Sequence, residues 1–170
     1  ERIKERSGIY FFARPFAPEG KLAFLFPGEG SQYVNMLADL CLPFPEARAC
    51  FDLLDRAYAG HSQGTLPSHF IFPPTAEQKE RAEQAIYAME GAVDAVSTAN
   101  RALYKLFSAL QIHPDAIVGH SSGELVALEA SGAVLLTDEE EVLRHIQVGN
   151  AIIASLKQTD TIPEGQLLAV

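Results

Sequence analysis

Hydrophobic positions along the chain occur as short continuous runs and as longer runs with helical spacing. The run 21–26 (KLAFLF) stops at the glycine turn 27–30 (PGEG) and predicts a buried strand, and the run 116–120 (AIVGH) predicts a second. The final residues, 166–170 (QLLAV), predict the beginning of a third strand. Because helical patterns separate these strands, the chain predicts an α/β fold with a mostly parallel sheet covered by helices on both faces.

The helical patterns are bounded by recognisable start and stop signals. Thr75 and Thr137 each stand three positions before a glutamine or glutamate, as in a capping box that opens a helix. The segment 75–111 is one long helix or two helices that meet near Gly91, and residues 60–74 are predicted to form an irregular loop. The predicted helices cover residues 31–40, 46–59, 75–111, 122–132 and 137–157, and Pro43 and Pro45 separate the first two.

The order of these elements indicates an incomplete domain. Residues 1–20 are charged, then aromatic, then interrupted by prolines, which is typical of a linker that enters a domain. Residues 21–165 are predicted to form a large α/β unit, and residues 166–170 the first strand of a further unit. Three strands are few for 170 residues and the last one is cut short, so we expect the sequence to be part of a longer protein.

Composition and charge narrow the range of functions. The chain is 48% hydrophobic and 21% charged, as in a globular domain with a real core. It has no apolar run near the roughly 20 residues of a membrane-spanning helix and no N-terminal secretory signal, so we expect a cytoplasmic protein. A net charge of −9 disfavours binding to nucleic acid or to an anionic membrane. Cys41 and Cys50 match no disulfide framework or metal site and are predicted to be small buried residues.

The segment 116–128 (AIVGHSSGELVAL) carries the strongest chemical signal. It places Ser121 between Gly119 and Gly123, after a strand and before a helix, as in the strained turn that exposes a nucleophilic serine. Such a turn aims the first amides of the helix at the substrate. The backbone N–H of Ser122 can therefore bind a developing oxyanion.

A second oxyanion donor is expected from the glycine turn that follows the first strand. If the two strands are adjacent and parallel, the segment 27–31 (PGEGS) exposes the N–H of Glu29 or Gly30 at the same edge of the sheet as Ser121. The alternative interpretation is that both segments are merely tight turns.

With both motifs, the chain resembles the acyltransferase domains of polyketide synthases and the malonyl-CoA:acyl carrier protein transacylases. Residues 8–20 resemble the segment that joins a ketosynthase to its acyltransferase in a multidomain synthase. The rest of the resemblance, from about Lys21 to Val170, rests on FLFPGEGSQY (24–33), FDLLDRA (51–57), IFPP (71–74), PDAIVGHSSGELVAL (114–128) and GAV (132–134), in that order.

The resemblance implies an α/β-hydrolase-like core with flanking helices, truncated at the start of a small ferredoxin-like subdomain. It implies that Ser121 takes an acyl group from acyl-CoA as an ester and passes it to the phosphopantetheine thiol of an acyl carrier protein, with no bound cofactor. The amides of Ser122 and Glu29 would be the oxyanion donors, and a ketosynthase domain would adjoin. Glu29 stands where the family usually has glutamine, which need not matter for a main-chain donor.

A serine nucleophile needs a general base. His120 directly precedes Ser121, and its side chain is expected to point to the opposite face and to pack beside the turn. In the family the base is a histidine well downstream, so we expect it beyond residue 170 and expect these 170 residues alone to turn over slowly or not at all. The remaining histidines carry no signal: His61, His69, His113 and His145.

The acyl pocket also departs from the family pattern. Family members that load malonyl groups hold the free carboxylate with an arginine just before a glycine, and matching on Gly149 puts Val148 there. Glu90 stands where a second active-site glutamine usually precedes proline, and with Glu29 it would repel a dicarboxylic acyl group. We therefore expect an uncharged acyl unit, such as acetyl or a longer fatty acyl chain. The alternative is that Arg144, one helical turn before Val148, replaces the arginine.

Two other functions fit the same serine turn. A serine esterase or thioesterase would pass the acyl group to water. An acyltransferase-like module without catalytic activity would serve for docking within a synthase, and the departures at the active site keep this alternative open.

Overall fold

A two-stranded parallel sheet organises the part of the molecule that carries Ser121. Strand β3 (Ala23–Phe26) pairs with strand β4 (Ala116–Gly119), and Phe26 lies opposite Gly119. Both strands occur where the apolar runs predict them, and their parallel pairing agrees with the predicted α/β class. The computed structural model describes residues 2–4, 10–12, 20–59, 66–73, 75–86 and 89–158.

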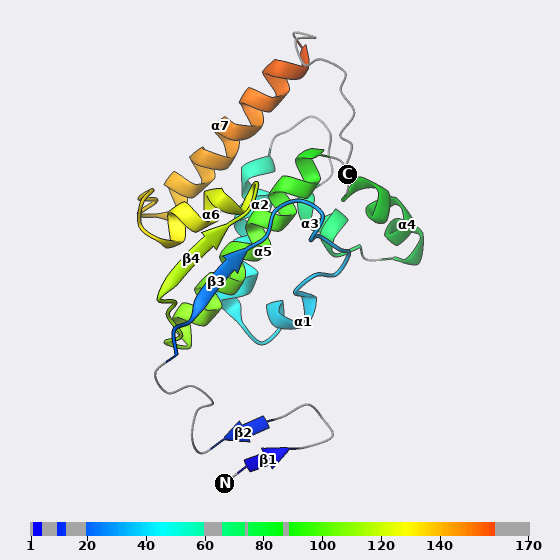
Figure 1. Cartoon of the computed structure of the whole chain (residues 1–170). Coiled ribbons are helices and arrows are strands. Elements are labelled where there is room, and N and C mark those ends of the chain that lie inside the picture. The colour runs from blue at the N-terminus through cyan, green and yellow to red at the C-terminus, as the bar shows by residue number, and fades with distance from the viewer. Residues whose placement is uncertain are drawn as a thin grey trace, which may run out of the picture.

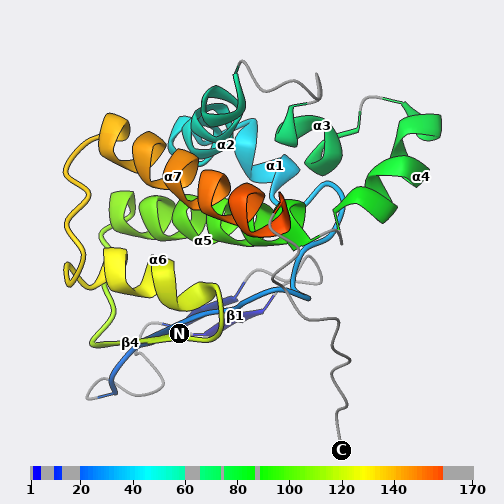
Figure 2. The ribbon, with the colours of Figure 1, turned by 90° about the horizontal axis from the view of Figure 1, so that it is seen from above.

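Two helices cover one face of this sheet, α5 (Met89–Ala109) and α6 (Gly123–Ala130) (Figure 1). Phe24 of β3 packs edge-on against Tyr104 of α5, with their ring centroids 6.4 Å apart. Val126 of α6 is buried in the same cluster. Figure 2 shows the strands, then α6 and α5, and then further helices as successive layers.

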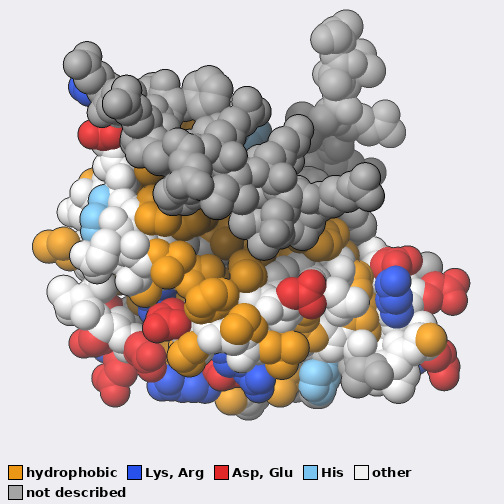
Figure 3. All heavy atoms as spheres, turned by 90° about the horizontal axis from the view of Figure 1, so that it is seen from below, with side chains coloured by type: hydrophobic (Ala, Val, Ile, Leu, Met, Phe, Trp, Pro, Cys, Tyr) orange, Lys and Arg blue, Asp and Glu red, His pale blue; other side chains and the backbone are white. Residues whose placement is uncertain are grey.

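The other face of the sheet is open among the described residues. Side chains alternate between the faces of a strand, and Leu25 and Val118 therefore point away from the helices, with 74% and 53% of their surface exposed. The prediction of helices on both faces thus holds for only one face of the part that the structure describes. Figure 3 shows hydrophobic side chains gathered on the face of the molecule that is seen from below.

The main core lies where α5 packs against α2 (Pro45–Tyr58), which also packs against α7 (Glu139–Gln158). Helix α2 starts with a proline, which fits the first turn because that turn has no hydrogen-bonded N–H to lose. Its apolar residues recur every three or four positions and so form one buried stripe. The buried core residues are Met36, Ala47, Cys50, Phe51, Leu54, Ala57, Ile71, Ile86, Ala95, Ala102 and Ile146.

Two predictions between residues 31 and 74 are wrong. Instead of a helix over 31–40, the chain forms turns and then the short helix α1 (Ala38–Cys41). The backbone at Asn35 and Leu37 has φ of 65° and 59°, which no helix accommodates, and the Asn35 N–H donates to the Ile71 carbonyl at 2.6 Å. The second correction is the short helix α3 (Pro67–Ile71), which lies within the predicted loop.

The segment 75–111 forms two helices, α4 (Ala76–Ala85) and α5. α4 ends before Ile86 and α5 begins at Met89, so the second alternative, two helices that meet near Gly91, is confirmed. The predicted cap of α4 is confirmed, because the Gln78 N–H donates to the Thr75 hydroxyl at 3.3 Å.

The cap of α7 lies one residue later than predicted. The Asp138 carboxylate accepts the Glu141 N–H at 2.9 Å, so Asp138 rather than Thr137 caps the helix. The N–H of Thr137 donates instead to the Glu141 carboxylate, at 2.6 Å. The helix extends to residue 158, close to the predicted end.

A short antiparallel pair lies within the predicted N-terminal linker: β1 (Arg2–Lys4) and β2 (Tyr10–Phe12). No strand was expected there. The division at residues 20 and 165 stays a prediction, and the strand predicted for 166–170 lies outside the described residues.

The two cysteines are free thiols. Cys50 is buried as predicted, whereas Cys41 is only partly buried. In the described ranges, no three His, Cys, Asp or Glu side chains gather in a way that could hold a metal ion. None of the described helices combines the length and apolar character needed to cross a membrane.

Candidate active site

Ser121 lies at the tip of the turn between β4 and α6. The strand ends at Gly119 and the helix begins at Gly123. The backbone of Ser121 has φ 53°, in the left-handed region that costs a residue with a side chain roughly 1–2 kcal/mol. Ser121 is exposed, so the strained turn presents its hydroxyl at the end of the sheet.

Gly119 and Gly123 are needed because their neighbours leave no room for a side chain. A Cβ on Gly119 would lie 2.5 Å from the Glu124 Cα. A Cβ on Gly123 would lie 2.2 Å from the carbonyl oxygen of Phe26, the last residue of β3. The first turn of α6 therefore packs directly on the end of the neighbouring strand.

The glycine turn after β3 lies against the Ser121 turn. Parallel neighbours bring their carboxyl ends to one edge of a sheet, and a Cβ on Gly28 would lie 2.7 Å from both the His120 carbonyl oxygen and the Ser121 Cβ. The Ser121 hydroxyl donates a hydrogen bond to the Glu29 carboxylate, with Oγ and Oε2 2.9 Å apart. The structure thus brings together two motifs whose hydrogen-bonded residues are 92 positions apart.

Two buried amide side chains hold the glycine turn in place. Gln32, 4% exposed, accepts the Gly30 N–H at 2.8 Å and donates to the Ile86 carbonyl at 3.2 Å. Asn100 of α5, 7% exposed, donates to the Pro27 carbonyl at 3.0 Å. Neither was singled out from the sequence, and both act as positioning residues for the backbone of the turn.

The Glu29 carboxylate accepts the hydrogen bond of the Ser121 hydroxyl and lies close to main-chain amides. Its own backbone N–H is the main cause that lowers the pKa of the Glu29 carboxyl below its ordinary value. Burial opposes this effect, and the hydroxyls of Ser121 and Ser122 and then the Ser122 N–H reinforce it. The amides of Glu29 and Ser122 therefore stabilise negative charge at this position. They are the same two main-chain donors that the sequence motifs predict for an oxyanion.

The other predicted pocket residues are not joined to Ser121. His120 is exposed, so the prediction that it packs beside the turn is wrong; it follows the last residue of β4 at the open sheet edge. Arg144 and Val148 lie one turn apart on α7, both exposed, and Arg144 makes no ion pair with any described residue. Glu90 belongs to the first turn of α5, and its side chain lies outside what the structure describes.

Among the described residues, no histidine is hydrogen-bonded to Ser121, whose hydroxyl donates to Glu29 instead. Three of the remaining histidines lie exposed on or near helices, and His61 is outside the described residues. The exposed ones are His69, His113 and His145.

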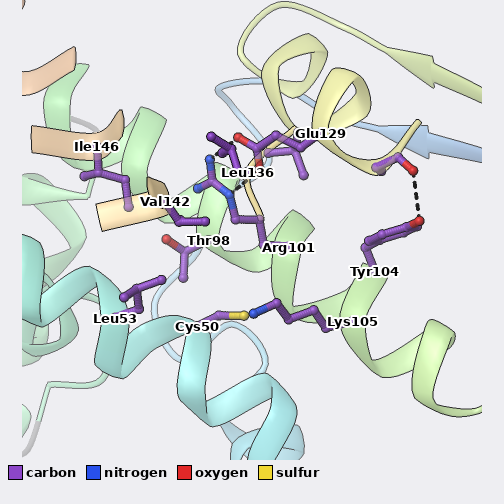
Figure 4. A pocket seen from close by; sticks show the side chains of 12 residues that line it. Cys50, Leu53, Thr98, Arg101, Tyr104, Lys105, Glu129, Leu136, Val142 and Ile146 are labelled. Carbon is purple, nitrogen blue, oxygen red and sulfur yellow. Dashed lines mark hydrogen bonds and ion pairs between the residues drawn. The ribbon is translucent and has the colours of Figure 1, made fainter. Parts of the chain in front are cut away.

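A cavity of about 170 Å³ lies behind the Ser121 turn, between α2, α5, α6 and α7. The guanidinium of Arg101 and the carboxylate of Glu129 form a bidentate ion pair there, with N–O distances of 2.7 and 2.6 Å, and both side chains are 13% exposed. The Tyr104 hydroxyl donates to the Ala130 carbonyl at 2.9 Å (Figure 4). These contacts fasten the far end of α6 to α5, and the cavity does not include Ser121.

Comparison with known proteins shows which family this chain is similar to. Residues 23–158 match the family model of the acyl transferase domain. The chain is 30% identical over 171 residues to a polyunsaturated fatty acid synthase subunit of Thraustochytrium sp., covering 97% of this chain and 6% of that protein. It is 35% identical over 124 residues to the malonyl CoA-acyl carrier protein transacylase of Bacillus subtilis, covering 73% of this chain and 35% of that protein.

A solved structure shows the same fold. The acyl transferase domain of ZmaA superposes with a TM-score of 0.67 at 25% identity, over 86% of this chain and 32% of that one. The sheet edge, the serine turn and these similarities together define the class: the chain belongs to the acyl transferase domain family and has its α/β-hydrolase-like fold. It spans about a third of the transacylase and a small fraction of the Thraustochytrium synthase.

Proposed function

We propose that Ser121 carries an acyl group as an ester, takes it from acyl-CoA and passes it to the phosphopantetheine thiol of an acyl carrier protein. The observation that carries this proposal is the meeting of the Ser121 turn with the amides of Glu29 and Ser122 at one sheet edge. The names of the relatives, a polyunsaturated fatty acid synthase and an acyl carrier protein transacylase, support the choice of donor and acceptor.

The chemistry follows from these groups. The Ser121 oxygen attacks the thioester carbonyl as its proton passes to a general base, and the carbonyl oxygen becomes an oxyanion that the N–H groups of Ser122 and Glu29 bind. The C–S bond then breaks, and the CoA sulfur leaves as a thiol with the proton from the base. The carrier thiol reverses these steps. The resemblance leads us to place the base, a histidine, outside residues 1–170; among the described residues, the Ser121 hydroxyl donates to Glu29 and to no histidine.

We further propose that the transferred group is uncharged, acetyl or a longer fatty acyl chain. The Glu29 carboxylate touches the nucleophile and no described cation pairs with it, so a second carboxylate on the substrate would be repelled. Val148 offers no charge to a malonyl carboxylate. A charged hydrogen bond of that kind contributes about 1.5–3 kcal/mol, or roughly 10- to 150-fold in affinity.

The test is acylation of the complete acyltransferase domain with radiolabelled acetyl-CoA, followed by mass spectrometry of the peptide that contains Ser121. We expect an acyl-serine that persists without a carrier and disappears when carrier is added, and no label in Ser121→Ala. Ser131→Ala, a hydroxyl lost from the opposite end of α6, is the matched control and keeps the label. Label that is lost to water as fast as to carrier would show a hydrolase, and labelling of Ser121→Ala equal to wild type would refute the nucleophile.

Acyl selectivity is measured in the same assay. Acetyl-, longer fatty acyl- and malonyl-CoA compete for Ser121, and we expect the uncharged groups to dominate. Malonyl as the main product in wild type, lost in Arg144→Ala, would assign the substrate carboxylate to Arg144 and reject our choice of acyl group.

A further inference from the structure

The carboxylate of Glu29 lies in hydrogen-bond contact with the hydroxyl of Ser121. We propose that the Glu29 carboxylate is a built-in ligand of the oxyanion site, and that an acyl thioester must displace it before Ser121 can be acylated. This inference rests on the proposed function, because it concerns how that site is filled between turnovers.

The geometry places the carboxylate at the reacting atoms. Glu29 Oε2 lies 2.9 Å from Ser121 Oγ and accepts its hydrogen bond, so the nucleophile's proton points at Glu29 and not at a base. Gly28 seats the Glu29 backbone directly beside Ser121, since a Cβ there would lie 2.7 Å from the Ser121 Cβ. The carboxylate is therefore aligned with the nucleophile by the fold itself.

The Glu29 backbone is fixed, whereas its side chain has room to leave. The turn is held from both sides, by the Gln32 amide at Gly30 and by the Asn100 amide at Pro27. Glu29 itself is exposed, so its side chain can rotate into solvent without moving those bonds. Departure of the side chain exposes the Glu29 N–H, which is the donor that the substrate oxygen then uses.

The charge of Glu29 is balanced by the donors of the site. None of the ion pairs among the described residues involves Glu29. Its own N–H, the hydroxyls of Ser121 and Ser122 and the Ser122 N–H lower the pKa of its carboxyl. The Ser122 amide belongs to the N-terminal end of α6, where the helix favours negative charge. The two amides that favour this carboxylate are the ones that a tetrahedral oxyanion would also use, because the Ser121 hydroxyl is itself the nucleophile.

If Glu29 were the general base, replacing it would change the acylation rate in the opposite direction. A base is improved by a raised pKa, whereas these donors lower the pKa of Glu29 and make it a weaker proton acceptor. If Glu29 blocks the site, neutral glutamine of the same shape should bind the donors less tightly and speed acylation. If Glu29 is the base, glutamine should slow it.

The experiment is single-turnover acylation of Ser121 by acetyl-CoA, below saturation, in the complete acyltransferase domain. We expect Glu29→Gln to raise the acylation rate roughly tenfold, as expected for replacing a charged hydrogen bond by a neutral one. Glu124→Gln is the matched control: it removes an exposed carboxylate from the first turn of α6 and should leave the rate unchanged. A rate in Glu29→Gln that is unchanged or lower overturns the proposal.

A second measurement needs no turnover. The Glu29 carboxyl, followed by carbon-13 NMR titration, should have a pKa below the ordinary glutamate value in wild type and a higher one in Ser121→Ala, which lacks one donor. An ordinary pKa in wild type, or no change in Ser121→Ala, overturns the proposal even if acylation is normal. Absence of acylation in every variant would reject the proposed function and this inference with it, whereas acylation of wild type that Glu29→Gln does not speed would reject this inference alone.

Discussion

Gly123→Ala tests the packing that builds the serine turn. The added Cβ would lie 2.2 Å from the Phe26 carbonyl oxygen and 2.5 Å from that of Pro27, where ordinary contacts begin at 3.4 Å. Both neighbours are backbone atoms, so α6 has to retreat from β3 by about 1.2 Å. Such overpacking costs typically 1–3 kcal/mol, and we expect about 2–3 kcal/mol here because no flexible side chain can give way.

For a chain of this length, that loss lowers the midpoint of thermal unfolding by about 4–12 °C. A displacement near 1 Å between Ser121 and its oxyanion donors should also slow acylation about 100-fold. Thermal unfolding followed by circular dichroism and Ser121 labelling measure the two effects separately. Gly149→Ala in α7 is the control: nothing lies within 4 Å of its added Cβ, so it should stabilise the protein by about 0.5–1 kcal/mol. If Gly123→Ala unfolds at the wild-type temperature and is labelled at the wild-type rate, the close contact between α6 and β3 is wrong.

Three further predictions concern the scaffold. Arg101→Met should lower the free energy of unfolding by about 3–5 kcal/mol, because it leaves the Glu129 carboxylate unpaired and largely buried. Adding Glu129→Leu should recover most of the loss. Urea denaturation of both variants checks this, and an Arg101→Met variant as stable as wild type would contradict it. Asp138→Ala should cost about 1 kcal/mol in the same assay, since it removes the cap of α7, whereas an unchanged unfolding midpoint would show that the cap contributes nothing. Burial is the main cause that raises the pKa of both cysteine thiols. Iodoacetamide at pH 8 should therefore label half-buried Cys41 before buried Cys50. Equal labelling rates for the two thiols would contradict the burial of Cys50.

The strands and the serine turn could be predicted because their signals are local. Short apolar runs end at glycines, and Gly119 and Gly123 stand at the two positions where the Ser121 turn has no space for a side chain. Adjacent parallel strands then require the two turns to share an edge. The predicted helix over 31–40 failed because Asn35 makes a tertiary hydrogen bond to Ile71, and its left-handed backbone overrides the helical spacing.

The residues that hold the site could not be predicted in the same way. Gln32 and Asn100 bind backbone carbonyls 54 and 73 positions away. Every residue has a backbone carbonyl, so the sequence does not indicate which one a distant amide will bind. The only available signal was the position of Asn100 on the apolar face of its helix, four residues after buried Val96. The motifs predict that the turns of Ser121 and Glu29 lie side by side. They do not predict the hydrogen bond between the two side chains, since the direction of the Glu29 side chain depends on donors from both turns.

Helix α5 gives the two halves of the proposed oxyanion site a common support. Asn100 holds the turn after β3, and its neighbour Arg101 holds the helix that follows Ser121. A tilt or slide of α5 therefore carries both amides along as a pair, and their spacing survives movements that would pull apart two independently anchored loops. Sequence changes that shift this helix can therefore alter the surrounding pocket and still leave the spacing of these two amides constant.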